Sequence, residues 1–326
     1  MERRVFLGTL TGSLLTAPLA AEAQSAGKVY RIGVVLEGGP YYAAIDGLRE
    51  GLKETGFDER THYLLLVRDM KGSLAAIAGA AQDLERDKVD LIYAIATSVA
   101  KAVQGATRTV PIVFYAGSDP VDNGLVDSFA NPGGRLTGVH SRNVALTSKR
   151  LEILKEILAR NSFRALTYYD STNPIARGYA KEAREAARQL RIELLERYVR
   201  SVDELRTGVQ RLKPGEVDAL FVPIDAMLTS QAAFIADTAK IKKLPTMFYE
   251  RTAVEAGGLA SYGTSYYSVG RLAAKYVRQV LLGARPADLP VERSERFELV
   301  INLTTAKALG LTIPPALLQR ADHVIE

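Results

Sequence analysis

The sequence predicts an α/β protein built of two doubly wound, Rossmann-like lobes, each a parallel sheet with helices on both faces. Short apolar runs rich in β-formers alternate with helical segments, and strands buried on both faces of a parallel sheet have this continuous apolar pattern. The alternation occurs twice, on either side of a turn-rich stretch at 117–134. With 326 residues the chain also has the length of about two domains.

The composition excludes several classes of protein. The chain has 42 Lys and Arg against 37 Asp and Glu, a net charge of +5, and 47% of its residues are hydrophobic. This balance is not that of a disordered chain or of a polybasic nucleic-acid binder. Because there is no Cys, disulfides, thiolate metal sites and a Cys nucleophile are excluded as well.

The first residues have the three-part order of an export signal. Arg3 and Arg4 precede an apolar run at 5–19, and the small-residue pattern Ala-Glu-Ala ends at Ala23. We therefore expect residues 1–23 to be a signal peptide cleaved near Ala23, with the mature protein in the periplasm. A membrane anchor is less favoured, because the apolar run is short and contains Gly and Pro. The paired arginines fit a twin-arginine signal as well as an ordinary one.

The first half of the mature chain contains three strand–helix pairs and a fourth strand. The opening apolar run at 30–36 predicts a strand, and Ile45, Leu48 and Leu52 follow at the spacing of one helix face before Gly56 ends the helix. The same reasoning predicts strands at 30–36, 62–67, 90–96 and 111–115, alternating with helices at 42–55, 73–86 and 98–106.

The alternation resumes after the turn-rich stretch. The pattern predicts helices at 147–159, 175–190, 202–212 and 226–240, and strands at 164–169, 191–198, 218–222 and 245–249.

The last third is less regular. A strand or crossover is expected at 259–262, a helix at 268–282 that Gly283 ends, a strand at 296–301 and a short helix at 304–309. We expect the first lobe to comprise 28–141 plus 264–290, and the second to comprise 142–263 plus 291–326. The chain then crosses between the lobes more than once.

Candidate binding residues follow from the rule that open parallel sheets bind ligands outside the carboxyl ends of their strands. Hydroxyl residues before a helix leave backbone N–H groups and a positive dipole end free for a carboxylate. Acidic side chains can hold an ammonium group, and tyrosine rings can stack on an apolar body. The candidates are Glu37, Gly38, Tyr42, Thr97, Ser98, Ser118 and Asp119 in the first half, and Tyr169, Asn173, Asp225, Tyr249 and Glu250 in the second.

Each candidate also has a plainer role. Hydroxyl residues such as Thr97 and Ser118 can simply cap their own helices, tyrosines can pack in the core, and loop carboxylates can be solvated. The argument for a site is that such residues recur at successive strand ends.

Signatures of catalysis are few. The chain has no dinucleotide fingerprint, Walker loop or G-x-S-x-G elbow, and its three histidines do not have metal-ligand spacing. Ser98 and Lys101 match the S-x-x-K pattern of penicillin-recognising acyl transferases, but the companion S-D-N and K-T-G elements are absent. A periplasmic Ser/Lys acyl hydrolase stays a minor alternative, and no cofactor or metal is expected.

A set of longer motifs identifies the chain as similar to a known family. These motifs are Gly47-Leu48-Arg49-Glu50-Gly51-Leu52, Val110-Pro111-Ile112-Val113-Phe114, Asp119-Pro120-Val121, Asn131-Pro132-Gly133-Gly134, Gly283-Ala284-Arg285-Pro286 and Asn302-Leu303-Thr304-Thr305-Ala306. From about residue 28 to 326 the chain resembles the substrate-binding proteins of bacterial ABC importers, in particular the branch of the tryptophan/tyrosine transporter type.

The resemblance implies a type I periplasmic-binding-protein fold, in which three connecting strands join two lobes around a ligand cleft. It also implies that loops at 97–98 and 118–119 hold a ligand carboxylate, and that Asn173, Asp225 and Glu250 hold the amino end. The chain departs from the family pattern at Ala226, where relatives often have Asn, and at 37–41, where the first loop is usually rich in Ser. These departures bear on which ligand is bound.

The sequence thus predicts an exported, monomeric receptor without enzymatic activity. It would capture a small organic solute, with an aromatic amino acid or aromatic carboxylate favoured, by closure of the lobes, and deliver it to an inner-membrane ABC permease. A nucleic-acid partner is not expected. The alternative is a ligand-sensing module for a chemoreceptor or a kinase.

Overall fold

The computed structural model describes residues 27–141, 145–173 and 176–326. The predicted signal peptide and its cleavage site lie outside these residues. None of the helices in the described part of the chain has the length and apolar character that a membrane crossing needs.

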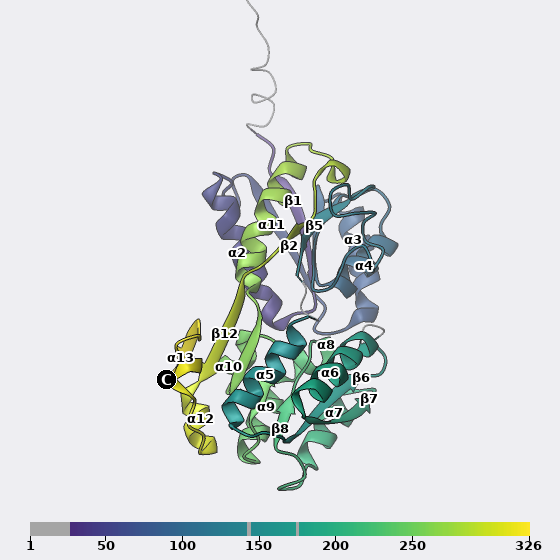
Figure 1. Cartoon of the computed structure of the whole chain (residues 1–326). Helices are drawn as coiled ribbons and strands as arrows, with labels where there is room; N and C mark the ends of the chain where they lie inside the picture. Colours follow the sequence, from purple (N-terminus) through teal and green to yellow (C-terminus); the bar gives the residue numbers. More distant parts are fainter. Residues whose placement is uncertain (1–26, 142–144, 174–175) are drawn as a thin grey trace, which may run out of the picture.

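The first lobe is a six-stranded sheet in which every pairing is parallel. Its strand order is β11 (Glu292–Arg293), β5 (Leu136–His140), β4 (Ile112–Ala116), β3 (Leu91–Ile95), β1 (Tyr30–Leu36) and β2 (Tyr63–Asp69). The carboxyl ends of these strands face the second lobe (Figure 1).

The second lobe is a seven-stranded sheet that is parallel except for the pairing of β10 with β12. Its order is β13 (His323–Ile325), β12 (Phe297–Asn302), β10 (Ala260–Thr264), β9 (Thr246–Phe248), β8 (Ala219–Phe221), β6 (Arg164–Asp170) and β7 (Glu193–Val199). The predicted pair of α/β lobes is thus confirmed.

Helices cover both sheets (Figure 1). The first lobe has α2 (Tyr42–Glu54), α3 (Ile77–Arg86), α4 (Thr97–Ala106) and α11 (Tyr266–Leu281), with short 3-10 turns η1 (Gly39–Tyr41), η2 (Leu74–Ala76) and η3 (Pro286–Asp288). The second has α5 (Leu146–Leu158), α6 (Ala176–Leu190), α7 (Val202–Gln210), α8 (Ala226–Ser230), α9 (Ala232–Ile241), α10 (Arg251–Glu255), α12 (Leu303–Leu309) and α13 (Pro315–Leu318).

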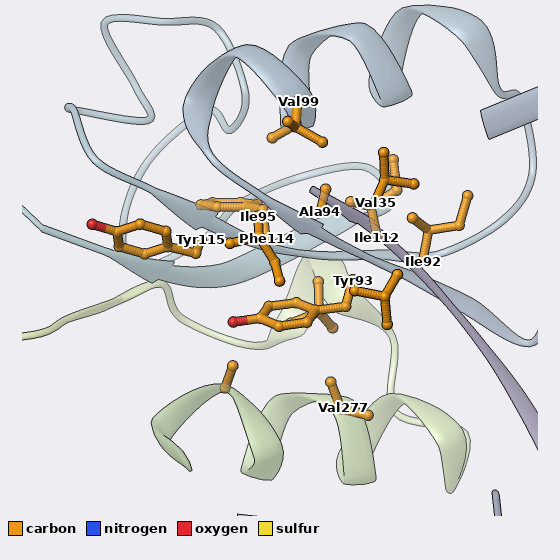
Figure 2. Close-up of a cluster of buried hydrophobic side chains, with 14 of the residues drawn as sticks. Val35, Ile92, Tyr93, Ala94, Ile95, Val99, Ile112, Phe114, Tyr115 and Val277 are labelled. Atoms are coloured by element: carbon orange, nitrogen blue, oxygen red, sulfur yellow. The ribbon is translucent and has the colours of Figure 1, made fainter. Parts of the chain in front are cut away.

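The core of the first lobe lies on both faces of its sheet. Figure 2 shows Val99 of α4 over one face, and Tyr93 with Val277 of α11 on the other. All three side chains are fully buried. Because both faces are covered, the strands read as continuous apolar runs in the sequence.

Helices α2 and α11 pack against each other at glycines. A Cβ added at Gly47 would lie 1.9 Å from the carbonyl oxygen of Tyr267, and one at Gly270 would lie 1.9 Å from that of Ala44. Only glycine permits so close an approach of two backbones. Gly47 begins one of the motifs on which the family resemblance rests.

The chain passes between the lobes three times: after β5, between β10 and α11, and between β11 and β12. Strand β11 pairs with β5 in the first sheet, although it lies past the expected lobe boundary at 290–291.

One element was predicted wrongly. The helix expected at 226–240 is two helices, because the chain leaves helical geometry at Gln231, which ends α8 and begins α9.

Candidate functional site

A cavity of about 40 Å³ lies between the lobes, at the carboxyl ends of their strands. Residues of both lobes line it: Glu37, Tyr41, Ala96, Thr97, Ser98, Tyr115, Gly117 and Tyr266 from the first, and Asn173, Tyr179, Ile224 and Asp225 from the second. The site thus has the position that the strand-end rule predicts.

Glu37 brings a carboxylate into the cavity from the first lobe. It follows the last residue of β1, and its side chain is 8% exposed. The hydroxyl of Ser98 donates a hydrogen bond to Oε1 of Glu37. Burial raises the pKa of Glu37 to about 7, and the charge of Asp225 adds to this effect, whereas the hydrogen bond from Ser98 opposes it.

Asp225 brings a second carboxylate from the opposite lobe. It caps α8, where Oδ1 accepts from the backbone N–H groups of Met227 at 2.9 Å and Leu228 at 3.2 Å. The amide of Asn173 donates to Oδ2 at 2.9 Å. The residue is 4% exposed, and burial raises its pKa to about 6 against the effect of these hydrogen bonds. Two buried acids therefore face one cavity.

The N-terminus of α4 forms another part of the wall. Before it, Ala96 has φ 121° and ψ 155°, a backbone conformation that non-glycine residues rarely adopt and that costs about 1–3 kcal/mol. The hydroxyl of Thr97, the first residue of α4, lies 3.0 Å from that of Ser118 in the loop after β4, and Asn123 donates to Ser118 at 3.0 Å. Because the first N–H groups of a helix have no acceptor within the helix, an oxygen at this wall could accept from them.

Tyrosine rings form the apolar part of the wall. The rings of Tyr41 and Tyr266 meet edge to face at 4.9 Å, and those of Tyr115 and Tyr266 at 5.7 Å. Tyr179 adds a ring from the second lobe. Burial raises the pKa of Tyr41, Tyr179 and Tyr266 above the ordinary value, so these phenols are neutral.

Arg150 lies near these rings without lining the cavity. It is 1% exposed, and its Nε donates to the carbonyl of Tyr262 at 2.6 Å. Burial lowers the pKa of Arg150 to about 10, while the surrounding tyrosines raise it. The guanidinium therefore stays charged at neutral pH.

Five of the twelve residues that the sequence singled out line the cavity together: Glu37, Thr97, Ser98, Asn173 and Asp225. The other candidates of the first lobe lie outside its lining. Tyr42 is 44% exposed and donates to Asp69 at 3.0 Å. Gly38 turns the chain at φ 90°, and Ser118 lies behind Thr97. Asp119 accepts from backbone N–H groups of its own turn.

The remaining candidates of the second lobe have structural partners. Tyr169 is buried with its ring against Tyr198. The hydroxyl of Tyr249 lies 2.6 Å from that of Thr229. Glu250 caps α10 and lines a different cavity, which also includes Pro40 and Tyr267. Packing or helix capping thus explains the contacts of these three residues.

The twelve candidates included none of the four tyrosines that line the cavity. Tyr41 is next to the expected Tyr42, and η1 turns the first of the pair inward. Tyr115 is the penultimate residue of β4, so its position near the end of a strand was a usable signal. Tyr266 begins α11 two residues after the end of β10, so strand-end position was a usable signal for it as well. Tyr179 lies one turn inside α6, and no pattern in its segment indicated that it reaches the cavity.

Ser98 and Lys101, the pair that matches the S-x-x-K pattern, line a second cavity together. The Ser98 hydroxyl donates to Glu37, and Lys101 is exposed on the next turn of α4. Among the described residues no His, Asp and Glu side chains are grouped as a metal site requires.

Comparisons with known proteins agree on one family. The model of the family described as "ABC transporter substrate binding protein" matches residues 30–325. A tyrosine-binding protein of Clostridioides difficile is 28% identical over 265 residues, which are 81% of this chain and 76% of the relative.

Two solved structures extend the comparison. An ABC domain from Streptococcus pneumonia in complex with L-Trp is 28% identical with a TM-score of 0.82, covering 91% of this chain and 100% of that one. A ligand-free, open substrate-binding protein with adhesive properties from Clostridium difficile is 26% identical with a TM-score of 0.65, covering 91% and 99%.

Proposed function

The chain belongs to the ABC transporter substrate-binding protein family, and on that premise we propose that it is the receptor of an ABC importer. It captures a small aromatic solute between its lobes and delivers that solute, unchanged, to an inner-membrane permease. The observation that carries the proposal is the cavity that residues of both lobes line together.

Lobe closure is the proposed mechanism of capture. The cavity of about 40 Å³ is smaller than the roughly 300–1,000 Å³ of ordinary ligand pockets, so a solute of amino-acid size enters only when the lobes part. Contacts from both lobes then favour the closed state over the open one, which is the only way a ligand can drive closure.

The comparisons support this mechanism. The chain superposes on the L-Trp complex with a TM-score of 0.82 but on the ligand-free, open relative with only 0.65, although the two identities, 28% and 26%, are nearly equal. A difference in lobe opening accounts for such a gap between relatives of one fold.

An aromatic amino acid or aromatic carboxylate is the proposed class of solute. Tyr41, Tyr115, Tyr179 and Tyr266 offer ring faces and edges to an aromatic body. Of the relatives above, one is a tyrosine-binding protein and another has been solved in complex with L-Trp.

The proposed location is the periplasm. An export signal at 1–23, cleaved near Ala23, is what the order of charged, apolar and small residues supports. There the receptor acts as a monomer, with the permease as its protein partner and without nucleic acid.

Calorimetric titration with tyrosine and tryptophan tests the proposal. We expect saturable, one-to-one binding that Ser98→Phe abolishes, because the added ring fills the cavity. Gly105→Phe is the matched control: it lies on the same helix α4, and a Cβ there meets nothing within 4 Å. Absence of binding by the unaltered, folded protein would reject the solute class. Equal affinities in Ser98→Phe and the unaltered protein would reject the site.

A further inference from the structure

We infer that the cavity holds its solute by a cationic amine between Glu37 and Asp225 and disfavours a solute carboxylate, so that aromatic monoamines bind more tightly than the corresponding amino acids. The inference rests on the proposed function, the capture of a small aromatic solute, and it replaces the proposed amino acid or carboxylate with an aromatic amine. It is carried by the charges, hydrogen bonds and rings that line the cavity.

The carboxylate of Glu37 occupies the place where a solute carboxylate would bind. A helix N-terminus attracts an anion, and Ser98 in the first turn of α4 adds a hydroxyl donor. The Ser98 hydroxyl, however, already donates to Glu37, whose buried carboxylate comes from the end of β1. A solute carboxylate there competes with Glu37 for the Ser98 hydroxyl and meets a like charge.

The opposite wall of the cavity also carries a negative charge. Asp225 faces the cavity from the second lobe, with Asn173 and two backbone N–H groups as its partners. The described residues that line the cavity include no Lys, Arg or His. An amine placed between the two acids therefore has an opposite charge on each lobe, whereas a carboxylate has none. This pairing also gives closure an electrostatic reason, since the cation contacts both lobes at once.

The tyrosine rings that line the cavity also favour a cation. Tyrosine faces carry negative charge density, and a cation within about 6 Å of such a face is attracted to it. The rings of Tyr41, Tyr115, Tyr179 and Tyr266 line the same cavity as the two acids. Their faces favour an ammonium group, whereas their neutral hydroxyls can donate a hydrogen bond to a carboxylate but carry no charge that balances it.

Arg150 is the buried cation that could favour the opposite result. Its guanidinium lies in electrostatic range of Tyr115, Tyr179 and Tyr266. It is not part of the cavity lining, and its Nε donates to the Tyr262 carbonyl in the second lobe. If a solute carboxylate reached Arg150, the amino acid would bind more tightly than the amine, and the experiment below detects that.

Matched ligands separate the two functional groups. Calorimetric titrations at pH 8 compare tryptophan, tryptamine and indole-3-propionate, and in parallel tyrosine, tyramine and 3-(4-hydroxyphenyl)propionate. We expect each amine to bind at least about tenfold more tightly than its amino acid, and neither acid to bind measurably. If an amino acid binds as tightly as its amine or more tightly, the inference is wrong while the proposed function stands. If none of the six ligands binds, both are wrong.

A variant that removes the charge of Glu37 tests whether this residue causes the preference for amines over amino acids. Glu37→Gln keeps the size of the side chain, and we expect the amine's affinity to fall about tenfold or more while the amino acid's affinity changes less. Asp119→Asn is the control, because Asp119 follows β4 at the same edge of the sheet but does not line the cavity. An unchanged ratio of amine to amino-acid affinity in Glu37→Gln would contradict the inference. Circular dichroism of each variant confirms that it is folded.

Discussion

The hydroxyl of Ser98, in the first turn of α4, donates a hydrogen bond to the carboxylate of Glu37, which lies 61 residues earlier at the end of β1. This contact places a negative charge of the protein beside a helix N-terminus that would otherwise attract a negative charge of the solute. With Asp225 on the opposite lobe, it makes the cavity acidic on both sides.

Glu37→Gln should stabilise the protein more at pH 8 than at pH 5. The pKa of Glu37 is raised from 4.5 to about 7 in the folded state, so the folded protein binds this proton more tightly than the unfolded chain does. The free energy of unfolding of the unaltered protein therefore falls as the pH rises from about 4.5 to about 7. The free energy of unfolding falls by at most about 3 kcal/mol, and this fall is absent from Glu37→Gln because its side chain does not ionise. Urea unfolding at both pH values checks this. An equal effect of the substitution at pH 5 and at pH 8 would show that burial does not raise the pKa of Glu37.

Tryptamine binding should tighten with rising pH. A cation binds the ionised forms of Glu37 and Asp225, whose pKa values are raised to about 7 and about 6, so binding at lower pH must first release protons. We expect the affinity to increase about tenfold or more between pH 5.5 and pH 7 and then to level off. Calorimetry in buffers of different ionisation enthalpy also measures the protons released. Constant affinity and no proton release would contradict the role of the two acids.

Tyr179→Leu should weaken the binding of aromatic solutes about tenfold, because it removes a ring of the wall while retaining apolar volume. Tyr42→Leu is the matched control, since Tyr42 is 44% exposed and does not line the cavity. Fluorescence or calorimetric titration of both variants measures the difference. Loss of affinity in Tyr42→Leu alone would favour the sequence-based expectation over the geometry of the cavity.

Gly47→Ala should destabilise the first lobe by about 1–3 kcal/mol or more, because its Cβ would lie 1.9 Å from the carbonyl oxygen of Tyr267 and two backbones would have to separate. Gly79→Ala, in α3, is the control: a Cβ there meets nothing within 4 Å. It should be neutral or stabilising by up to about 1 kcal/mol. Urea unfolding curves of the two variants decide. Equal stability would mean that α2 and α11 can move apart at little cost.

The fold could be predicted from the sequence because each element of a doubly wound sheet has a local pattern. The apolar run at 30–36 and the helical spacing of Ile45, Leu48 and Leu52 correspond to β1 and α2. The break at Gln231 was missed because apolar residues continue on both sides of it, so the pattern of one long helix persists across α8 and α9.

The site was predictable only in part. Strand-end position identified Glu37, Thr97, Ser98, Asn173 and Asp225, because parallel strands end at one edge. It could not separate Tyr41 from Tyr42, whose orientation depends on the phase of a short 3-10 turn. Nor could it find Tyr179, which lies inside α6 and not at the end of a strand.

The distance between the two lobes during ligand titration tests the central claim most directly. The chain has no Cys, so Gln82→Cys on α3 and Lys181→Cys on α6, both at exposed positions, accept a fluorophore pair specifically. Saturation with the ligand that binds most tightly in calorimetry should raise the energy transfer between them, with a midpoint that matches the calorimetric affinity. Saturable binding with an unchanged inter-lobe distance would contradict capture by lobe closure.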